Sequence, residues 1–420
     1  MKAPSHSDIL PPLLGRAFPP PGLTSGEQEA ILALQRVLDA EIAPAAEAHD
    51  ARGRYPIDAI AALKRSGILA SAIPRELGGL GFSHRASMEA QLRIAAADSA
   101  VGQIFKIHEE CLREAVVNVP DELRPALLKA VLEERKIIGL AVAEAGRKVD
   151  EPMRTLFTPR PDGGGVVEGQ KVYTTGAAGA DIIEVWSFDP RTPGIDENPV
   201  LGLRVSLVPS SAPGITIHRD WNALGQRATD SGTITLTDLH VEPSWNGQAP
   251  GRFPSLHAPL VWQLGFAANM LGNAIGAFKA AVPFVKDRSR PWPSSGADSA
   301  ADDPYVRRLA GELVADLAAA YTLMLSAADL LDACARGEVD RTTVAIPIYA
   351  AKSAASRAAL RATHEIFALM GTRSAAGPTG FDRYWRNVRT ISLHDPVDWK
   401  NAEIGRHVLT AWDPPWGIYQ

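Results

Sequence analysis

Apolar residues recur at helical spacing over the first third of the chain. Ile31, Leu34, Leu38 and Ile42 follow one another at steps of three and four residues, the spacing of one face of an α-helix. Stretches rich in Gly and Pro, such as PRELGGLGFSH, mark points where helices end. The pattern predicts a helical domain over residues 27–136, preceded by an N-terminal extension over residues 1–26.

Near residue 137 the pattern changes to the two-residue alternation of half-buried strands. GTITLTDLHVEP alternates Thr with Ile and Leu, and further strand candidates are KVYTTG, DIIEVWSF, LGLRVSLVPS and GITIHRDW. PDGGG at 161–165 lies between strand candidates, as expected for a hairpin. This block predicts a central antiparallel β domain over residues 137–245.

Long Ala-rich helices are predicted again in the last part of the chain, over 260–288, 304–336 and 341–370. The loop RPWPSSGADSAADD separates the first two. A C-terminal helical domain over 246–420 is therefore expected. The order of helices, strands and helices predicts an α+β fold with a β domain between two helical domains.

Charge and cysteine content argue against several functions. The 43 basic and 48 acidic residues are scattered, which argues against nucleic acid or an anionic membrane as the main partner. Cys111 and Cys334 cannot form a multi-cysteine metal site or a disulfide framework. Prolines interrupt the N-terminus where a signal peptide needs an apolar core, and no window reaches the ~18 to 20 apolar residues of a membrane span. We expect a cytoplasmic protein outside membranes, with no metal site.

Two segments offer groups that could bind a ligand. In KVYTTGAAGAD, the hydroxyls of Thr174 and Thr175 stand beside a glycine turn, which can contact a flat polar ring or form a plain β turn. Arg290 and Arg373 lie near predicted helix ends, where an arginine can bind an anionic cofactor or satisfy carbonyls and acids. Both interpretations stay open from these residues alone.

Two histidines have unusual neighbours. His108 lies in VGQIFKIHEECL beside an apolar helix face, which suits a packed core histidine or a catalytic one. His394 precedes Asp395 and Pro396, and Asp395 can cap a helix that begins at Pro396. That capping role explains the aspartate and leaves His394 without a structural explanation.

Four segments together resemble the acyl-CoA dehydrogenase superfamily over residues 27–420: IPRELGGLGF, AADSA, GQKVYTTGAAGAD and DWNALGQRATDSGTITLTDLHVEP. RPW at 290–292, FDRYWRNVRT at 381–390, SLHDP at 392–396 and the place of His108 after VGQIF look most like the flavin-dependent monooxygenases of the dibenzothiophene monooxygenase type. The resemblance implies an acyl-CoA dehydrogenase-like fold and a homotetramer.

The resemblance also implies an activity. In that group a separate NAD(P)H:flavin reductase delivers reduced FMN or FAD, O2 adds to the flavin C4a atom, and the hydroperoxide transfers one oxygen atom to the substrate. A two-component monooxygenase acting on a small, largely apolar organic substrate is therefore expected. The resemblance places His394, His108 and Thr175 at the reacting centre. It gives His394 the role of a proton relay. It assigns the flavin to Arg290, Arg373, Trp221, Tyr173, Thr174, Thr175, Glu144 and Ser231.

Two other functions stay open. An acyl-CoA dehydrogenase or oxidase with bound FAD needs a carboxylate base, often a glutamate in a YEG-type motif, and here that region reads SLHDP with Asp395 as its carboxylate. A catalytically inactive homologue acting as a binding or assembly subunit is the third possibility. It is motivated by GLAVAEAGR, which offers a flavin only Glu144, and by Ile391, Ile107 and His240 at positions where relatives place polar groups.

Overall fold

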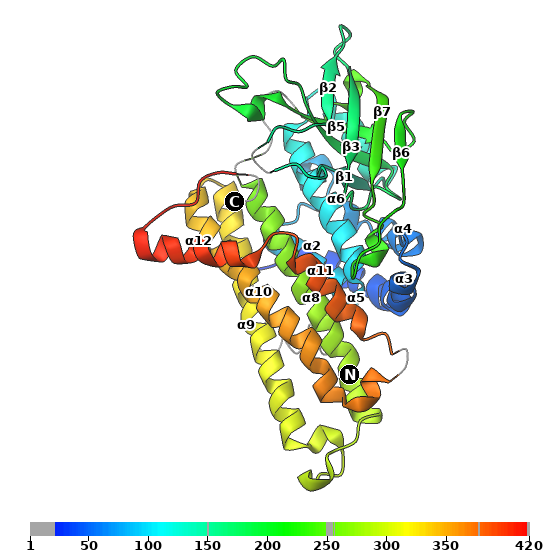
Figure 1. Ribbon diagram of the computed structural model, residues 1–420, viewed down its shortest axis with the longest axis vertical. Helices are drawn as coiled ribbons and strands as arrows, with labels where there is room; N and C mark the ends of the chain where they lie inside the picture. The colour runs from blue at the N-terminus through cyan, green and yellow to red at the C-terminus, as the bar shows by residue number, and fades with distance from the viewer. Residues whose placement is uncertain (1–21, 149–150, 249–254, 256, 377–378, 418–420) are drawn as a thin grey trace.

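A computed structural model of the protein describes residues 22–148, 151–248, 255, 257–376 and 379–417. The β domain and the N-terminal helices lie together at one end, and the long C-terminal helices extend away from them (Figure 1). Helices, strands and helices follow one another along the chain. The α+β architecture predicted from the hydrophobic pattern is confirmed, and the elements change type close to the predicted domain boundaries.

Helices make up the N-terminal part, and their caps and apolar faces explain their bounds. Thr24 and Glu27 form a reciprocal capping box at the start of the first helix. The predicted apolar face is buried, with Ile31, Leu34 and Ile42 at most 4% exposed. The helices are α2 (Ser25–Val37), α3 (Ala46–Arg52), α4 (Ile57–Ser66), α5 (His84–Ala97), α6 (Ser99–Asn118) and α7 (Arg124–Leu132).

Seven strands form one sheet: β1 (Ile138–Ala141), β2 (Leu156–Pro159), β3 (Gly165–Lys171), β4 (Ile182–Phe188), β5 (Leu203–Pro209), β6 (Ile215–Ile217) and β7 (Ile234–Val241). The order is β1-β4-β2-β3-β7-β6, with β5 paired to β4. β1 pairs with β4 in parallel, so the prediction of a wholly antiparallel domain is wrong in this part. Alternation gives the period of a strand and carries no information about the direction of its neighbour.

The C-terminal part is a helical bundle of α8 (Ala258–Asp287), α9 (Pro304–Ala335), α10 (Arg341–Met370), α11 (Asp382–Ser392) and α12 (Val397–Thr410). The first three lie within two residues of the predicted ranges. α9 is long and apolar enough to cross a membrane by length and composition, but half of its apolar window is buried inside the protein, as in the core helix of a bundle.

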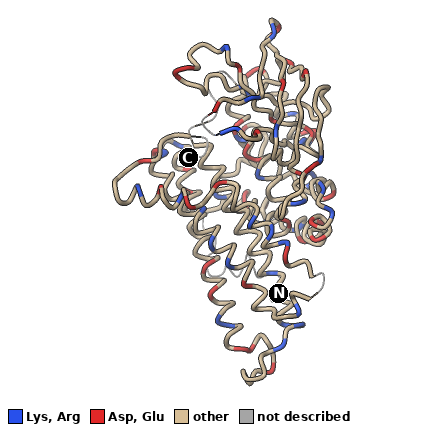
Figure 2. Tube along the Cα trace, in the orientation of Figure 1, with Lys and Arg blue, Asp and Glu red and all other residues tan. Residues whose placement is uncertain are grey.

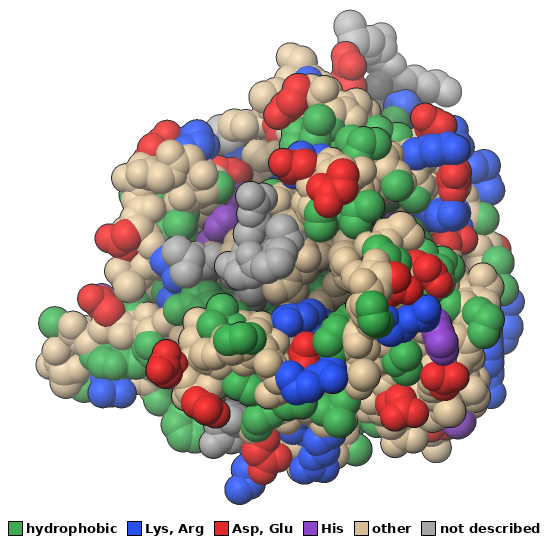
Figure 3. Space-filling view, turned by 90° about the horizontal axis from the view of Figure 1, so that it is seen from above, with side chains coloured by type: hydrophobic (Ala, Val, Ile, Leu, Met, Phe, Trp, Pro, Cys, Tyr) green, Lys and Arg blue, Asp and Glu red, His purple; other side chains and the backbone are tan. Residues whose placement is uncertain are grey.

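Charged residues are distributed over all parts of the fold. Lys and Arg are interspersed with Asp and Glu along the helices and the β domain (Figure 2), and they are intermixed on the face seen from above (Figure 3). This agrees with the scattered charges of the sequence. After α12 the chain turns back, and Arg341 on α10 donates hydrogen bonds to the carbonyls of Pro414 and Pro415.

Candidate active site

Hydroxyl groups form a hydrogen-bonded chain where the turn after β3 meets α6. The hydroxyl of Thr229 donates to the carbonyl of Gln226 at 2.8 Å, so its oxygen accepts from Ser231 at 2.7 Å. Ser231 therefore accepts from Thr175 at 3.0 Å. The oxygen of Thr175 is left as an acceptor, and Gln103 on α6 donates to it at 3.5 Å.

Gln103 is a site residue that the sequence analysis missed. Its amide nitrogen faces Thr175, while its Oε1 is buried with no hydrogen-bond partner among the described residues. A buried acceptor without a partner costs about 1 to 3 kcal/mol, so such an atom indicates a place for a ligand or a water. Gln103 precedes His108 by five residues on the same helix, and helical periodicity alone does not distinguish it from a surface glutamine.

Aromatic side chains adjoin the hydroxyl chain. Tyr173 has a left-handed backbone (φ 56°) and a largely exposed ring, which meets the ring of Trp221 edge to face at 5.9 Å. The indole N–H of Trp221 donates to the carbonyl of Gln226 at 2.9 Å. The structure thus brings Thr175, Ser231, Tyr173 and Trp221 together.

Two predicted flavin contacts have structural roles instead. Thr174 is 1% exposed, and both its N–H and its hydroxyl donate to the carbonyl of Gly232, at 3.2 and 2.8 Å. Glu144 accepts hydrogen bonds from Lys171 Nζ at 2.8 Å and from two backbone N–H groups. Burial raises the pKa of Glu144, but the bonds from Lys171 and the backbone outweigh it and lower the pKa to about 2. Through these hydrogen bonds, Thr174 and Glu144 hold the loops around β3.

His108 is a structural histidine, and the predicted catalytic role does not fit its contacts. It is fully buried, its Nδ1 accepts from the N–H of Ile138 at 3.0 Å, and its Nε2 therefore donates to the carbonyl of Leu69 at 2.9 Å. Burial lowers its pKa to about 4. Both ring nitrogens are occupied by backbone groups, so neither is available to a substrate.

His394 lies in the turn between α11 and α12, where three helices meet. Its ring packs against Phe266 of α8, with ring centroids 4.3 Å apart. The residue is nevertheless exposed, so solvent reaches it. Its dense surroundings, together with the charges of Lys106 on α6 and Lys352 on α10, lower its pKa to about 4. At neutral pH the reachable group here is a neutral imidazole, which can both donate and accept a hydrogen bond.

The sequence predicted that Asp395 caps the following helix, and the structure shows that it does not. α12 begins at Val397, no side chain caps it, and the carboxylate of Asp395 accepts from Lys352 Nζ at 2.8 Å. Asp395 is 9% exposed. A capping prediction considers only neighbours along the chain, and here a buried lysine on another helix binds the carboxylate instead.

Arg290 and Arg373 lie close to each other but away from the hydroxyl chain. The segments that carry them meet where Arg373 donates to the carbonyl of Arg288 at 2.9 Å and Ser289 donates to that of Met370 at 2.7 Å. Both arginines are exposed. They follow the ends of α8 and α10 that point away from the β domain (Figure 1). A single chain does not bring them to Thr175 and Trp221.

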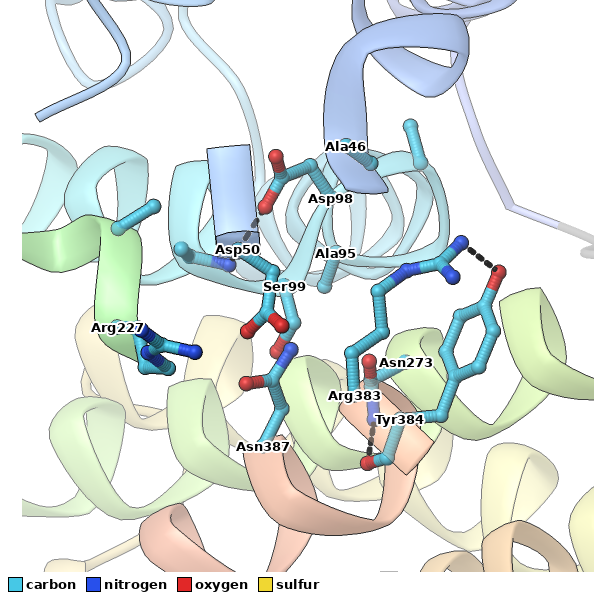
Figure 4. Close-up of a pocket in the computed structure, with 13 residues that line it drawn as sticks. Ala46, Asp50, Ala95, Asp98, Ser99, Arg227, Asn273, Arg383, Tyr384 and Asn387 are labelled. Carbon is cyan, nitrogen blue, oxygen red and sulfur yellow. Dashed lines mark hydrogen bonds between the residues drawn. The ribbon is translucent and has the colours of Figure 1, made fainter. Parts of the chain in front are cut away.

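Two cavities lie next to the hydroxyl chain, and Arg227 lines both of them. One of about 320 Å³ opens beside Trp221, and its lining includes the four arginines Arg52, Arg54, Arg219 and Arg227. The other, of about 10 Å³, lies between α5, α6 and α11 and has room for one water (Figure 4). Asn273 reaches the carbonyl of Tyr384 there, and the Tyr384 hydroxyl accepts from Arg383. This second cavity is too small for an organic ligand.

The groups around Thr175 suit a flat, hydrogen-bonding ring such as a flavin. They combine a free acceptor at Thr175, the unpartnered Oε1 of Gln103 and two aromatic rings. A β domain between two helical domains, with such a site where they meet, defines the class of proteins with the acyl-CoA dehydrogenase fold.

Comparison with known proteins supports this class and narrows it. Family models for the acyl-CoA dehydrogenase N-terminal and C-terminal domains match residues 24–133 and 264–399. Dibenzothiophene monooxygenase of Rhodococcus erythropolis is 34% identical over 367 residues, covering 84% of this chain and 86% of the relative. The chain belongs to the family of flavin-dependent monooxygenases related to that enzyme.

Solved structures give the same result. FMN-bound TdsC from Paenibacillus sp. A11-2 superposes with a TM-score of 0.87 at 30% identity, covering 93% of this chain and all of TdsC. Methanesulfinate monooxygenase MsuC from Pseudomonas fluorescens gives a TM-score of 0.84 at 30% identity, covering 95% of this chain and all of MsuC. The predicted family resemblance and fold are confirmed.

Proposed function

We propose that the protein is the oxygenase of a two-component system. It receives reduced flavin from a separate NAD(P)H:flavin reductase and uses O2 to add one oxygen atom to a small organic substrate. The FMN held by TdsC favours FMN over FAD as the flavin. A cytoplasmic location, without nucleic acid or membrane as partner, fits the scattered charge.

The state of Asp395 and His394 carries this proposal. Dehydrogenation of an acyl-CoA needs a free carboxylate to remove a proton from carbon. The carboxylate of Asp395 is nearly buried and bonded to Lys352, whereas the reachable side chain beside it is the neutral imidazole of His394. An imidazole that both donates and accepts can stabilise developing charge and move a proton during oxygen transfer.

We infer that the flavin ring lies against the group formed by Thr175, Gln103, Ser231, Tyr173 and Trp221. When bound, reduced flavin supplies the two electrons that activate O2. The oxygen of Thr175 can accept a hydrogen bond from a ring N–H, because its own proton is committed to Ser231. The exposed ring of Tyr173 and the half-buried Trp221 offer apolar surface that limits water at the ring.

Arg290 and Arg373 fit the flavin phosphate only if a second copy of the chain supplies them. Their segments meet at the far end of the bundle, so they can face the ring site of a neighbouring subunit rather than their own. This requirement supports the expectation of a homotetramer, since closed symmetric assemblies give every subunit the same shared site.

The proposal is tested with purified protein, a flavin reductase, NAD(P)H and FMN under ¹⁸O2. We expect reduced FMN to bind and one labelled oxygen atom to enter the product. Tightly bound FAD that is bleached by an acyl-CoA would instead identify a dehydrogenase. Failure to bind flavin in either redox state would identify an inactive binding subunit.

A further inference from the structure

The arginine-rich cavity beside Trp221 has no role in the reaction proposed above. It has a volume of about 320 Å³, and its lining includes Arg52, Arg54, Arg219 and Arg227. The first two arginines lie at the end of α3 and just after it, and the other two lie between β6 and β7. Sites for small molecules begin at about 300 Å³, so the cavity has room for a small organic ion.

The backbone around the cavity allows the four side chains to approach one another. Gly53 separates the first two arginines and has a left-handed conformation (φ 58°), and a Cβ on it would lie 3.5 Å from Nε of Arg227. Arg219 also has a left-handed backbone (φ 51°), which is uncommon for a residue other than glycine. Such a conformation is costly and persists only where the surrounding contacts hold it, so the fold specifies the position of Arg219.

Three of the four guanidinium groups are held in place by hydrogen bonds to backbone carbonyls. Arg52 donates to the carbonyl of Ala48 at 3.2 Å, and Arg54 donates to that of Arg219 at 2.7 Å. Arg219 in turn donates to the carbonyl of Ala178 at 2.8 Å. A guanidinium has five N–H donors, so most of the donors around the cavity have no acceptor among the described residues. Side chains that are fixed in advance lose less conformational entropy when a ligand binds.

Two acidic residues offset only half of the charge of the four arginines. Asp230 lies buried behind the lining and pairs with Arg219 at 3.0 Å and with Arg54 at 3.6 Å. Asp220 belongs to the lining, and hydrogen bonds from Thr233 lower its pKa, so it stays ionised. The other two arginines form no ion pair among the described residues. The cavity therefore carries an excess of two positive charges, which suits a doubly charged anion.

We propose that the arginine-rich cavity binds a phosphate group with two negative charges, either free phosphate or the head group of a small phosphate ester, separately from the flavin. A phosphate matches the excess charge, and its oxygens accept the paired N–H bonds that a guanidinium donates. The proposed function assigns the flavin phosphate to Arg290 and Arg373 of a second copy. On that assignment, the two charges of the cavity have no anion even when FMN is bound.

Calorimetry with two ligands of nearly equal shape tests the proposal on the flavin-free protein. At about pH 8, well above the second pKa of about 6 of a phosphate ester, methyl phosphate is a dianion. Methyl sulfate has the same tetrahedral head group and a single negative charge. We expect methyl phosphate to bind at least about tenfold more tightly, the scale of one charge-assisted hydrogen bond. Equal affinities, or no binding of methyl phosphate, would overturn the proposal without reference to any variant.

Two more ligands distinguish the sources of the phosphate group. Inorganic phosphate and glycerol phosphate share the head group, and only the second has an organic part that can contact Trp221 and Asn222 in the lining. Tighter binding of glycerol phosphate would support an ester as the occupant, and tighter binding of inorganic phosphate would support the free ion. Failure of both to bind would overturn the proposal.

Variants assign the binding to the cavity. Arg52→Met and Arg227→Met leave no carboxylate of the described residues unpaired, so both should fold, which circular dichroism checks. Each should weaken methyl phosphate binding about tenfold or more. Arg65→Met is the matched control, since it removes the same charge from α4, where the side chain is more than half exposed and pairs with Glu41 outside the cavity. Binding that survives both cavity substitutions, or that falls equally in the control, would contradict the assignment.

Titration of the same samples with FMN separates the cavity from the flavin site. Saturating methyl phosphate should leave the FMN dissociation constant within about twofold, and so should Arg52→Met. Competition between methyl phosphate and FMN that disappears in Arg52→Met would place the flavin phosphate in the cavity and overturn the proposal of a separate site. Methyl phosphate binding without any FMN binding would overturn the monooxygenase function and leave the phosphate site in place.

Discussion

Lys352 and Asp395 form a nearly buried ion pair at 2.8 Å that ties α10 to the turn carrying His394. The pair fixes this turn, because α12 has no side-chain cap to define its start. The orientation of His394 therefore depends on a contact between residues 43 positions apart in the sequence.

Removal of one member of this pair should destabilise the protein. Asp395→Ala leaves the Lys352 ammonium with Gln263 as its remaining acceptor, and we expect the free energy of unfolding to fall by about 3 kcal/mol. Urea unfolding followed by circular dichroism measures this. In the double variant Lys352→Met/Asp395→Ala no charge is left unpaired, so part of the loss should be recovered. A double variant as unstable as the sum of the single ones would show that the pair is not coupled.

The sequence predicts the helices well and the environment of the site only in part. Ala-rich runs bounded by Pro and Gly define α8, α9 and α10 to within two residues. Strand candidates are found by alternation, but KVYTTG is a strand only at Lys171 and continues as a turn, because Tyr173 and Gly176 take left-handed backbone conformations. The parallel pairing of β1 with β4 depends on packing between distant segments.

Site residues that act through one short motif are predictable, and those assembled from several helices are not. Thr175 and Ser231 belong to motifs that resemble the family's, and the structure brings them together. Lys106 and Lys352 belong to helices whose relative rotation is set by packing. From the sequence alone, a lysine in such a helix is predicted to be exposed to solvent.

His108→Ala should impair folding rather than catalysis. The change removes the partners of the Ile138 N–H and the Leu69 carbonyl, and each unpaired buried group costs about 1 to 3 kcal/mol. We expect a loss of about 2 to 6 kcal/mol in unfolding free energy. The kcat per folded molecule, with folded protein counted by the unfolding signal, should stay unchanged. A large loss of kcat in a stably folded variant would restore a catalytic role.

His394→Ala should have the opposite effect. The residue is exposed and makes its packing contact with Phe266, so the fold and FMN binding should stay nearly intact. Oxygen transfer should fall by about 10²-fold, the scale of lost acid and base assistance. Oxygen consumption should then yield hydrogen peroxide in place of product, measured with an oxygen electrode and a peroxidase assay. A variant that couples oxygen to product as well as the parent would rule the role out.

The pKa of His394 should lie well below that of a free histidine. The dense protein surroundings of the ring and the charges of Lys106 and Lys352 lower the pKa of His394 from 6.5 to about 4, with Asp395 opposing them. Because the folded pKa lies below the unfolded one, the stability that His394 contributes is complete above about pH 6.5 and is lost as pH falls toward 4. NMR of ¹⁵N-histidine-labelled protein, assigned with His394→Gln, measures this. Lys106→Met should raise the pKa, and a parent value near 6.5 would contradict the effect of the lysines.

Arg373→Ala should weaken FMN binding by about 1.5 to 3 kcal/mol, the range for a charge-assisted hydrogen bond to phosphate. Fluorescence titration with FMN measures the dissociation constant. Arg52→Ala is the matched control, because Arg52 lines the arginine-rich cavity beside Trp221 within the same chain. If Arg52→Ala weakens binding and Arg373→Ala does not, the phosphate lies in that cavity and no second subunit is needed.

Mixed oligomers test whether the arginines are shared between subunits. If they are shared, mixed oligomers of Arg373→Ala and Thr175→Val chains should contain some sites with both groups intact and bind FMN more tightly than either variant alone. Mixed oligomers no better than the variants would place both residues in one chain's site.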